Sequence, residues 1–220
     1  MPLTSIRKIY RLYSQFFSEC KELFLRLLPG RIDCCKINYD SSGSDKRVSI
    51  INNAAPDCVC EKHSMSYDSP YPINDNERIT RFVFIENHMR NDKKSVRPSF
   101  FSHIETKGCS IQRESIVNDD ELVAFVKEFI KKNPGRNWLG VVTGGCHEIR
   151  SILTDQDKRA CCVYDTGNES NPAHGEICRT HHIKEADKAE LRRHLMKVFH
   201  DGLVIEPDKY RDGKISSQIL

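Results

Sequence analysis

The sequence lacks any apolar run long enough to cross a membrane, since a spanning helix needs about 20 mostly apolar residues in a row. It also lacks the apolar core of a secretion signal, because charged side chains interrupt residues 1–17 every few positions. These two absences predict a cytoplasmic protein, and in that compartment thiols are kept reduced. We therefore expect the 10 cysteines to be free thiols and not disulfides, although the number is high for this length.

Motifs of the common enzyme classes are absent as well. The sequence contains no Walker loop, no dinucleotide-binding glycine fingerprint, no nucleophile elbow and no zincin motif. A large excess of one charge is also missing, because the formal net charge is only +3. Domains that bind nucleic acid usually carry clustered basic residues and a strongly basic composition. The sequence thus gives no specific signal for a nucleic-acid partner.

What is present divides the chain into four parts. Residues 1–30 have apolar side chains at three- and four-residue steps, which predicts an amphipathic N-terminal helix. Residues 31–76 are rich in Ser, Asn, Asp and Pro, which favours a polar linker or arm. We expect a compact domain over residues 77–203 and a tail over residues 204–220.

The compact domain shows short segments of both kinds of secondary structure. Alternating or β-branched runs predict strands at residues 79–85, 109–113, 138–143, 160–165 and 174–183, and an extended segment at residues 97–101. Helical patterns follow at residues 118–133, 146–153 and 184–200, the first with a capping box of Asn118 and Glu121. The predicted fold class is α+β, with a small, mostly antiparallel sheet and helices on one face, preceded by the amphipathic helix and a flexible arm.

Cysteine and histidine clusters raise the question of a metal. Cys58, Cys60 and His63 form a C-x-C-x-x-H pattern, and six more such residues follow at Cys161, Cys162, His174, Cys178, His181 and His182. Structural zinc sites usually use two C-x₂₋₄-C pairs or an equivalent spacing, which is not found here. We therefore predict no cofactor, with zinc kept as the alternative and buried cysteines acting as small apolar side chains.

Polar residues of the predicted domain form a second candidate site. His174 and Glu176 are two residues apart on one strand and share a face, so they can act as a general base and its orienting group. Arginine can hold an anion such as phosphate through paired hydrogen bonds. The structural alternative is that the arginines form ion pairs with the acidic residues. The candidates are, for catalysis, His174, Glu176 and Ser110 and, for binding, Arg97, Arg113 and Asp165.

Four short motifs between residues 79 and 199 resemble a group of small uncharacterised bacterial proteins. The motifs are Arg81-Phe82, then RPSF from Arg97, GCSIQR ending at Arg113, and PAHGEI from Pro172. The resemblance implies no activity that can be carried over to this chain. It implies only that Ser110, Arg113 and His174 are the first residues to test.

Two functions are compatible with these patterns. The first is an accessory or protein-interaction module of a bacterial mobile-element or phage-defence locus, because an amphipathic helix stands beside a domain without a complete catalytic signature. Residues 4–28 would then cover their apolar face on the domain itself, on a second copy or partner protein, or on an anionic membrane surface. The alternative is a small hydrolase or nuclease-like enzyme that uses His174 and Glu176, with Arg97 or Arg113 on a phosphate. That alternative requires these side chains to meet in one cleft.

Overall fold

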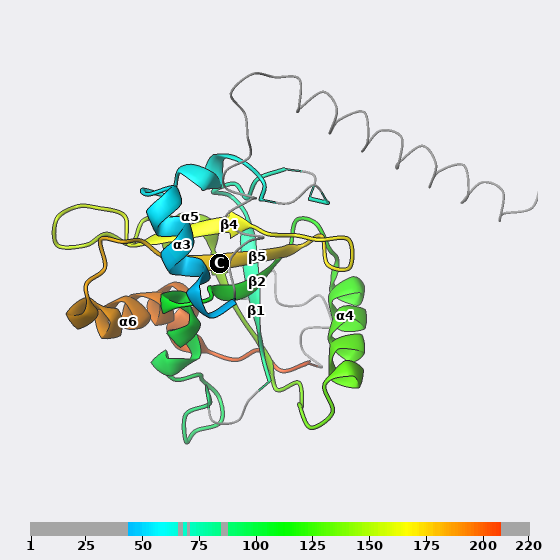
Figure 1. Cartoon of the computed structure of the whole chain (residues 1–220). Coiled ribbons are helices and arrows are strands. Elements are labelled where there is room, and N and C mark those ends of the chain that lie inside the picture. The colour runs from blue at the N-terminus through cyan, green and yellow to red at the C-terminus, as the bar shows by residue number, and fades with distance from the viewer. Residues whose placement is uncertain (1–43, 66–67, 70, 85–87, 208–220) are drawn as a thin grey trace, which may run out of the picture.

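A computed structural model describes residues 44–65, 68–69, 71–84 and 88–207 of the chain. The predicted amphipathic helix, with the docking segment at residues 4–28, lies outside these residues and stays a prediction. The fold is α+β, and its five-stranded sheet has the order β3-β1-β2-β5-β4 with every neighbouring pair antiparallel (Figure 1). The strands are β1 (Arg78–Val83), β2 (Cys109–Arg113), β3 (Gly140–Gly145), β4 (Cys161–Asp165) and β5 (His174–Arg179). The predicted fold class is thus confirmed.

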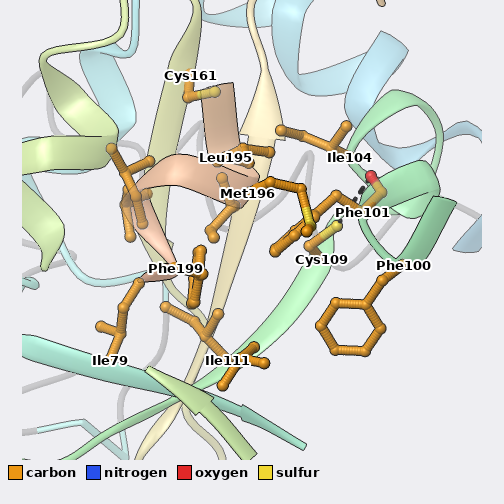
Figure 2. Close-up of a cluster of buried hydrophobic side chains, with 14 of the residues drawn as sticks. Ile79, Phe100, Phe101, Ile104, Cys109, Ile111, Cys161, Leu195, Met196 and Phe199 are labelled. Carbon is orange, nitrogen blue, oxygen red and sulfur yellow. Dashed lines mark hydrogen bonds between the residues drawn. The ribbon is translucent and has the colours of Figure 1, made fainter. Parts of the chain in front are cut away.

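The larger core lies on one face of the sheet. Alternate strand residues such as Ile79, Ile111 and Val163 point into it and are almost completely buried. Helix α6 (Lys188–Val198), the 3-10 helix η4 (Pro98–Glu105) and helix α5 (Cys146–Arg150) cover them. Figure 2 shows side chains from η4, β2 and α6 meeting there, with the Cys109 thiol donating to the Phe101 carbonyl.

Helices cover the second face too, whereas the sequence predicted helices on one face only. Cys162 and Tyr164 alternate with the residues of the larger core and pack with helix α3 (Arg47–Ala54). At the β3–β1 end of the sheet, Leu122 of helix α4 (Asp119–Lys132) packs beside Val141. Helices α3 and α4 stand well apart in the molecule (Figure 1), so they leave the middle of this face to other side chains.

The predicted polar arm at residues 31–76 is wrong for the part that the structure describes. Residues 44–65 form η1 (Ser44–Lys46), α3 and η2 (Val59–Lys62), and they pack on the sheet. Val48 and Ile51 are 0% and 1% exposed. Their spacing of three residues places them on one face of the helix. Polar residues surround them in the sequence and conceal this short apolar pattern, although one of these, Asn52, is buried and donates to the Arg179 carbonyl.

The expectation of unbridged cysteines is also wrong. Cys58 of the segment before η2 forms a disulfide with Cys162 of β4, with 5.3 Å between their Cα atoms, and Cys60 is disulfide-bonded as well. Cys109, Cys146, Cys161 and Cys178 are buried free thiols, as expected for cysteines that act as small apolar side chains. The cytoplasmic location, from which free thiols were expected, stays a prediction.

Of the other predicted features, the helix cap is confirmed and two element boundaries differ. The capping box of Asn118 and Glu121 is present in both directions. Residues 98–105 form the 3-10 helix η4 instead of an extended segment, because Pro98 stands at the first helical position, where its missing N–H costs nothing. The start of the predicted tail pairs with the sheet, since Ile205 exchanges two backbone hydrogen bonds with Val141. Among the described residues, no helix has the length and apolarity needed to cross a membrane.

Candidate functional site

Strands β1 and β2 separate in the middle of the sheet. Strand β1 pairs with β3 along six residues but with β2 only at Ile79–Arg113 and Thr80–Gln112. Arg81, the next residue of β1, reaches across the separation. Its Nη1 donates to the Ser110 carbonyl at 2.7 Å and its Nη2 to the Phe100 carbonyl at 3.1 Å. The Arg81 guanidinium therefore joins the two strands and η4 where the strand ladder stops.

A cavity of about 250 Å³ opens at this separation. Among the described residues, its lining contains two arginines, three histidines and five phenylalanines, and no Asp or Glu. The aromatic residues come from three elements, and Phe84 of the segment after β1 stacks on Phe129 of α4 with ring centroids 4.7 Å apart. The lining residues are Thr80, Arg81, Phe82, Phe84, His88, Phe100, His103, Ser110, Ile111, Gln112, Phe125, Phe129, Arg136, Asn171 and His174.

The Arg81 charge is buried without an acidic partner. The side chain is 8% exposed, and its Cζ lies 4.5 Å from the centroid of the Phe100 ring. Within the described part of the chain, no carboxylate lies within ion-pair distance of Arg81, and its Nε has no hydrogen-bond acceptor. Burying an uncompensated charge is costly. The cavity therefore has a fixed positive charge in its wall.

Arg113, unlike Arg81, has acidic partners. Its contacts show the role of two candidate residues, Arg113 itself and Asp165. It is completely buried, and its Nε and Nη2 each donate to the Glu77 carboxylate at 2.8 Å. Its Nη1 lies 3.4 Å from Asp165 and also donates to the Tyr71 carbonyl. Arg113 and Asp165 therefore form a structural ion pair, which is the structural alternative considered from the sequence.

His174, Glu176 and Ser110 lie on one face of β2 and β5, because Ser110 is opposite Glu176 and Gln112 is opposite His174 in the register. They do not form the expected catalytic pair. His174 Nδ1 is 2.7 Å from the Thr166 hydroxyl, so Thr166 and not Glu176 orients the ring. Glu176 is 3% exposed and accepts a hydrogen bond at 2.7 Å from the guanidinium of Arg47 in α3.

Arg97 lies apart from the other candidates. Its exposed side chain donates to Asn91 at 3.1 Å, and it is not among the residues that line the cavity. Arg113 is held in its own ion pairs. Of the six candidates, the structure brings His174 and Ser110 to the cavity, with Glu176 beside them, but neither arginine. The convergence that the hydrolase hypothesis required is not found among the described residues.

The three histidines of the cavity favour the neutral form. Burial lowers the pKa of His88, and the charges of Arg81 and Arg136 lower it further. The pKa of His103 is lowered by burial and by nearby Lys107 and Arg81. Burial, with smaller contributions from nearby arginines, lowers the pKa of His174 to about 4. At neutral pH the positive charge of the cavity therefore comes from its two arginines.

Possible metal ligands occur in two groups among the described residues. Cys58, Cys162 and Glu61 approach one another, but the two thiols form the disulfide. Both Glu61 oxygens accept hydrogen bonds from Arg159, and one also accepts from the Val163 amide. Donors therefore surround this carboxylate and compete with any metal. The second group, Asp57 with His181 and His182, lies at the surface.

Sequence reasoning missed Arg81 and the aromatic wall. Arg81 interrupts an apolar strand and lies on the same face as Ile79 and Val83, which are two residues before and after it. A charge on this inward-facing side of the strand was the available signal. The contribution of Phe125 and Phe129 was not recoverable, because it depends on how α4 crosses the sheet. No protein-family model, curated protein or solved structure matches this chain, so the interpretation of the site rests on its own residues.

Proposed function

We propose that the domain is a binding module, of the accessory kind expected from the sequence, that holds a small anionic molecule in the cavity between β1 and β2. The buried charge of Arg81 without a carboxylate partner carries this proposal. An anion in the cavity beside the Arg81 side chain compensates that charge and lowers the cost of burying it alone. Arg136 adds a second positive charge to the lining, and the described lining residues include no Asp or Glu, which supports the same sign of ligand.

The arrangement of the catalytic candidates supports binding over catalysis. Glu176 is held by Arg47 and His174 by Thr166. A general base needs hydrogen-bond reach to the proton that it removes, and a phosphate-directed enzyme needs cations beside that base. Of the two proposed arginines, one is exposed and the other lies in the buried ion pairs with Glu77 and Asp165. The expected origin in a mobile-element or phage-defence locus stays a prediction.

The test is an NMR titration of the ¹⁵N-labelled protein with acetate, inorganic phosphate and benzoate. We expect at least one of these anions to shift the amide signals of Thr80, Ser110 and Gln112 in a saturable way. Ser110→Trp fills the cavity and should abolish the shifts. Ser49→Trp makes the same change at an exposed position of α3, outside the cavity lining, and should preserve them. The proposal is wrong if none of the three anions moves the signals of the wild-type cavity.

A further inference from the structure

The geometry points to a metal site outside the cavity: we propose that Asp57, His181 and His182 bind one divalent transition-metal ion, with Zn²⁺ as the ion to test. One ligand atom of each residue lies within 4.8 Å of those of the other two. None of the three residues lines the cavity between β1 and β2, so this inference does not depend on the proposed anion binding. It also differs from the cysteine-containing sites considered from the sequence, because no thiol takes part.

A tight turn after β5 places the two histidines side by side. The Ile183 amide donates to the Thr180 carbonyl at 3.4 Å, with His181 and His182 between them. Thr180 and Ile183 are 0% and 6% exposed, and the Thr180 hydroxyl donates to the Arg159 carbonyl at 2.7 Å. The turn is therefore fixed at both ends, and its two imidazole rings lie next to each other with centroids 3.9 Å apart.

A second turn supplies the carboxylate from a distant part of the sequence. Asp57 and Cys58 both have left-handed backbone conformations, with φ of 58° and 60°, and the Val59 amide donates to the Pro56 carbonyl at 3.4 Å. Asp tolerates that conformation better than most residues. The buried Cys58 is linked by its disulfide to Cys162 of β4, the neighbour of β5 in the sheet. The second turn is therefore held beside the histidine turn.

The contact between the two turns has the donor atoms and the spacing of a metal site. His182 Nε2 lies 2.7 Å from Asp57 Oδ1, where a hydrogen bond joins them. Zinc bonds to nitrogen and oxygen are about 2.0–2.2 Å long, so the ligand atoms of tetrahedral zinc stand about 3.3–3.5 Å apart. The side chains of Asp57 and His182 are 65% and 22% exposed, and His181 is exposed as well. They can therefore adjust to a shared ion, which replaces the hydrogen bond.

The charge and chemistry of the group select the class of ion. The pKa of the Asp57 carboxyl is lowered, mainly by its hydrogen bond with His182 and further by nearby His181 and Lys158, so this carboxylate is ionised at neutral pH. Imidazole nitrogen suits Zn²⁺, Cu²⁺, Ni²⁺ and Fe²⁺, whereas Mg²⁺ and Ca²⁺ prefer oxygen ligands. Zinc takes four ligands, and among the described residues this group supplies three. The fourth position is then open to water.

The test is an NMR titration of the full ¹⁵N-labelled protein with zinc chloride at pH 7.5, without reductant so that the disulfide stays closed. A local readout is needed because the chain also has free thiols, which are zinc ligands when deprotonated. We expect Zn²⁺ to shift the amide signals of Asp57, His181 and His182 in a saturable way. Mg²⁺ at the same concentration should leave these signals in place.

Single substitutions assign the ligands. His181→Ala and Asp57→Asn should each weaken Zn²⁺ binding, reported by the His182 amide, by at least about 10-fold, since even the hydrogen-bond partners of metal ligands contribute about 10- to 100-fold to affinity. Asparagine also tolerates the left-handed backbone, so this variant retains the turn and removes only the charge. The matched control His147→Ala removes an exposed histidine outside the group and should leave the affinity unchanged.

Three results would overturn the site. The first is the absence of saturable shifts with Zn²⁺ in the wild-type protein. The second is an equal response to Mg²⁺, which would show simple attraction to the Asp57 carboxylate. The third is an unchanged Zn²⁺ affinity in His181→Ala or in Asp57→Asn. None of these results affects the proposal for the anion cavity, because the cavity lining shares no residue with this group.

Discussion

Arg81 of β1 and Arg113 of β2 lie on adjacent strands. Their roles differ because their hydrogen-bond partners differ. Arg113 is surrounded by the carboxylates of Glu77 and Asp165, so its charge is balanced inside the protein. Arg81 donates only to carbonyl oxygens, which accept its hydrogen bonds without cancelling its charge. Arg113 therefore stabilises the fold, whereas Arg81 is the residue to which we assign the proposed anion binding.

This difference can be tested with Arg113. We predict that Arg113→Met lowers the free energy of unfolding by about 3–5 kcal/mol, because it leaves two buried carboxylates without their cation. Urea denaturation followed by circular dichroism measures the change. Arg97→Met is the control, since Arg97 is exposed and surface changes usually stay within about 0.5 kcal/mol. Equal, small effects of the two substitutions would contradict the structural role of Arg113.

His174 should make stability depend on pH. Burial is the main cause that lowers its pKa to about 4 in the folded state, from an ordinary value of 6.5. Between these values the unfolded chain binds the proton and the folded chain does not, so unfolding is favoured as pH falls. The stabilisation is therefore complete above pH 6.5 and is lost progressively toward pH 4, by up to about 1.4 kcal/mol per pH unit.

The measurement is the free energy of unfolding at several pH values for wild type and His174→Asn. Asparagine retains a hydrogen-bonding group near the position of Nδ1, which faces Thr166, but it does not titrate. The nearby charges of Arg47 and Arg81 stay positive throughout this range. We expect the difference between the two proteins to shrink as pH falls from 7 to 4. A constant difference would show that His174 keeps the same protonation state in both folded and unfolded chains.

At the scale of secondary-structure elements, the sequence predicted the features that depend on local periodicity and on cap residues. The five strands, the capping box of α4 and the final helix followed from alternation, spacing and cap residues. Helix α3 was missed because only Val48 and Ile51 carry its apolar face and polar residues surround them. The six-residue pairing of β1 with β3 beside the two-residue pairing with β2 was not predictable, since pairing partners and their register are set by tertiary packing. The cavity arises from that unequal pairing, so its shape was beyond sequence reasoning.

The disulfide between Cys58 and Cys162 links the segment before η2 to strand β4. It joins residues 104 positions apart, and closing so long a loop restricts the unfolded chain strongly. We predict that Cys58→Ala with Cys162→Ala lowers the free energy of unfolding by about 2–5 kcal/mol. Denaturation without reductant measures this loss. Cys146→Ala removes a buried free thiol instead, and it controls for the loss of a buried sulfur atom.

The same pair of cysteines can be checked directly. Proteolysis of the unreduced protein followed by mass spectrometry should yield a cross-linked peptide containing Cys58 and Cys162. Recovery of both cysteines as labelled free thiols would restore the original expectation from the sequence. In that case the paired substitution would remove two close thiols and its effect should resemble that of Cys146→Ala.

At the scale of the whole molecule, the two faces of the sheet form one structural unit. The β4 and β5 residues contribute to both faces, so Val163 packs with the larger core while Cys162 packs with α3. Ion pairs also join residues 44–65 to strand β5, through Arg47 and Glu176, and to the segment just before β4, through Glu61 and Arg159. We therefore infer that residues 44–65 unfold together with the sheet and are not a separate arm.

Two matched core substitutions test this cooperativity. Ile51 of α3 and Ile111 of β2 are both 1% exposed, on opposite faces of the sheet. We predict that Ile51→Ala and Ile111→Ala each lower the free energy of unfolding by about 2–5 kcal/mol, in a single transition seen alike by circular dichroism and by the fluorescence of Trp138. Ser49→Ala, at an exposed position of the same helix, should change it little. An arm that detaches before the domain unfolds would behave differently, because Ile51→Ala would then leave the main transition in place while Ile111→Ala lowered it.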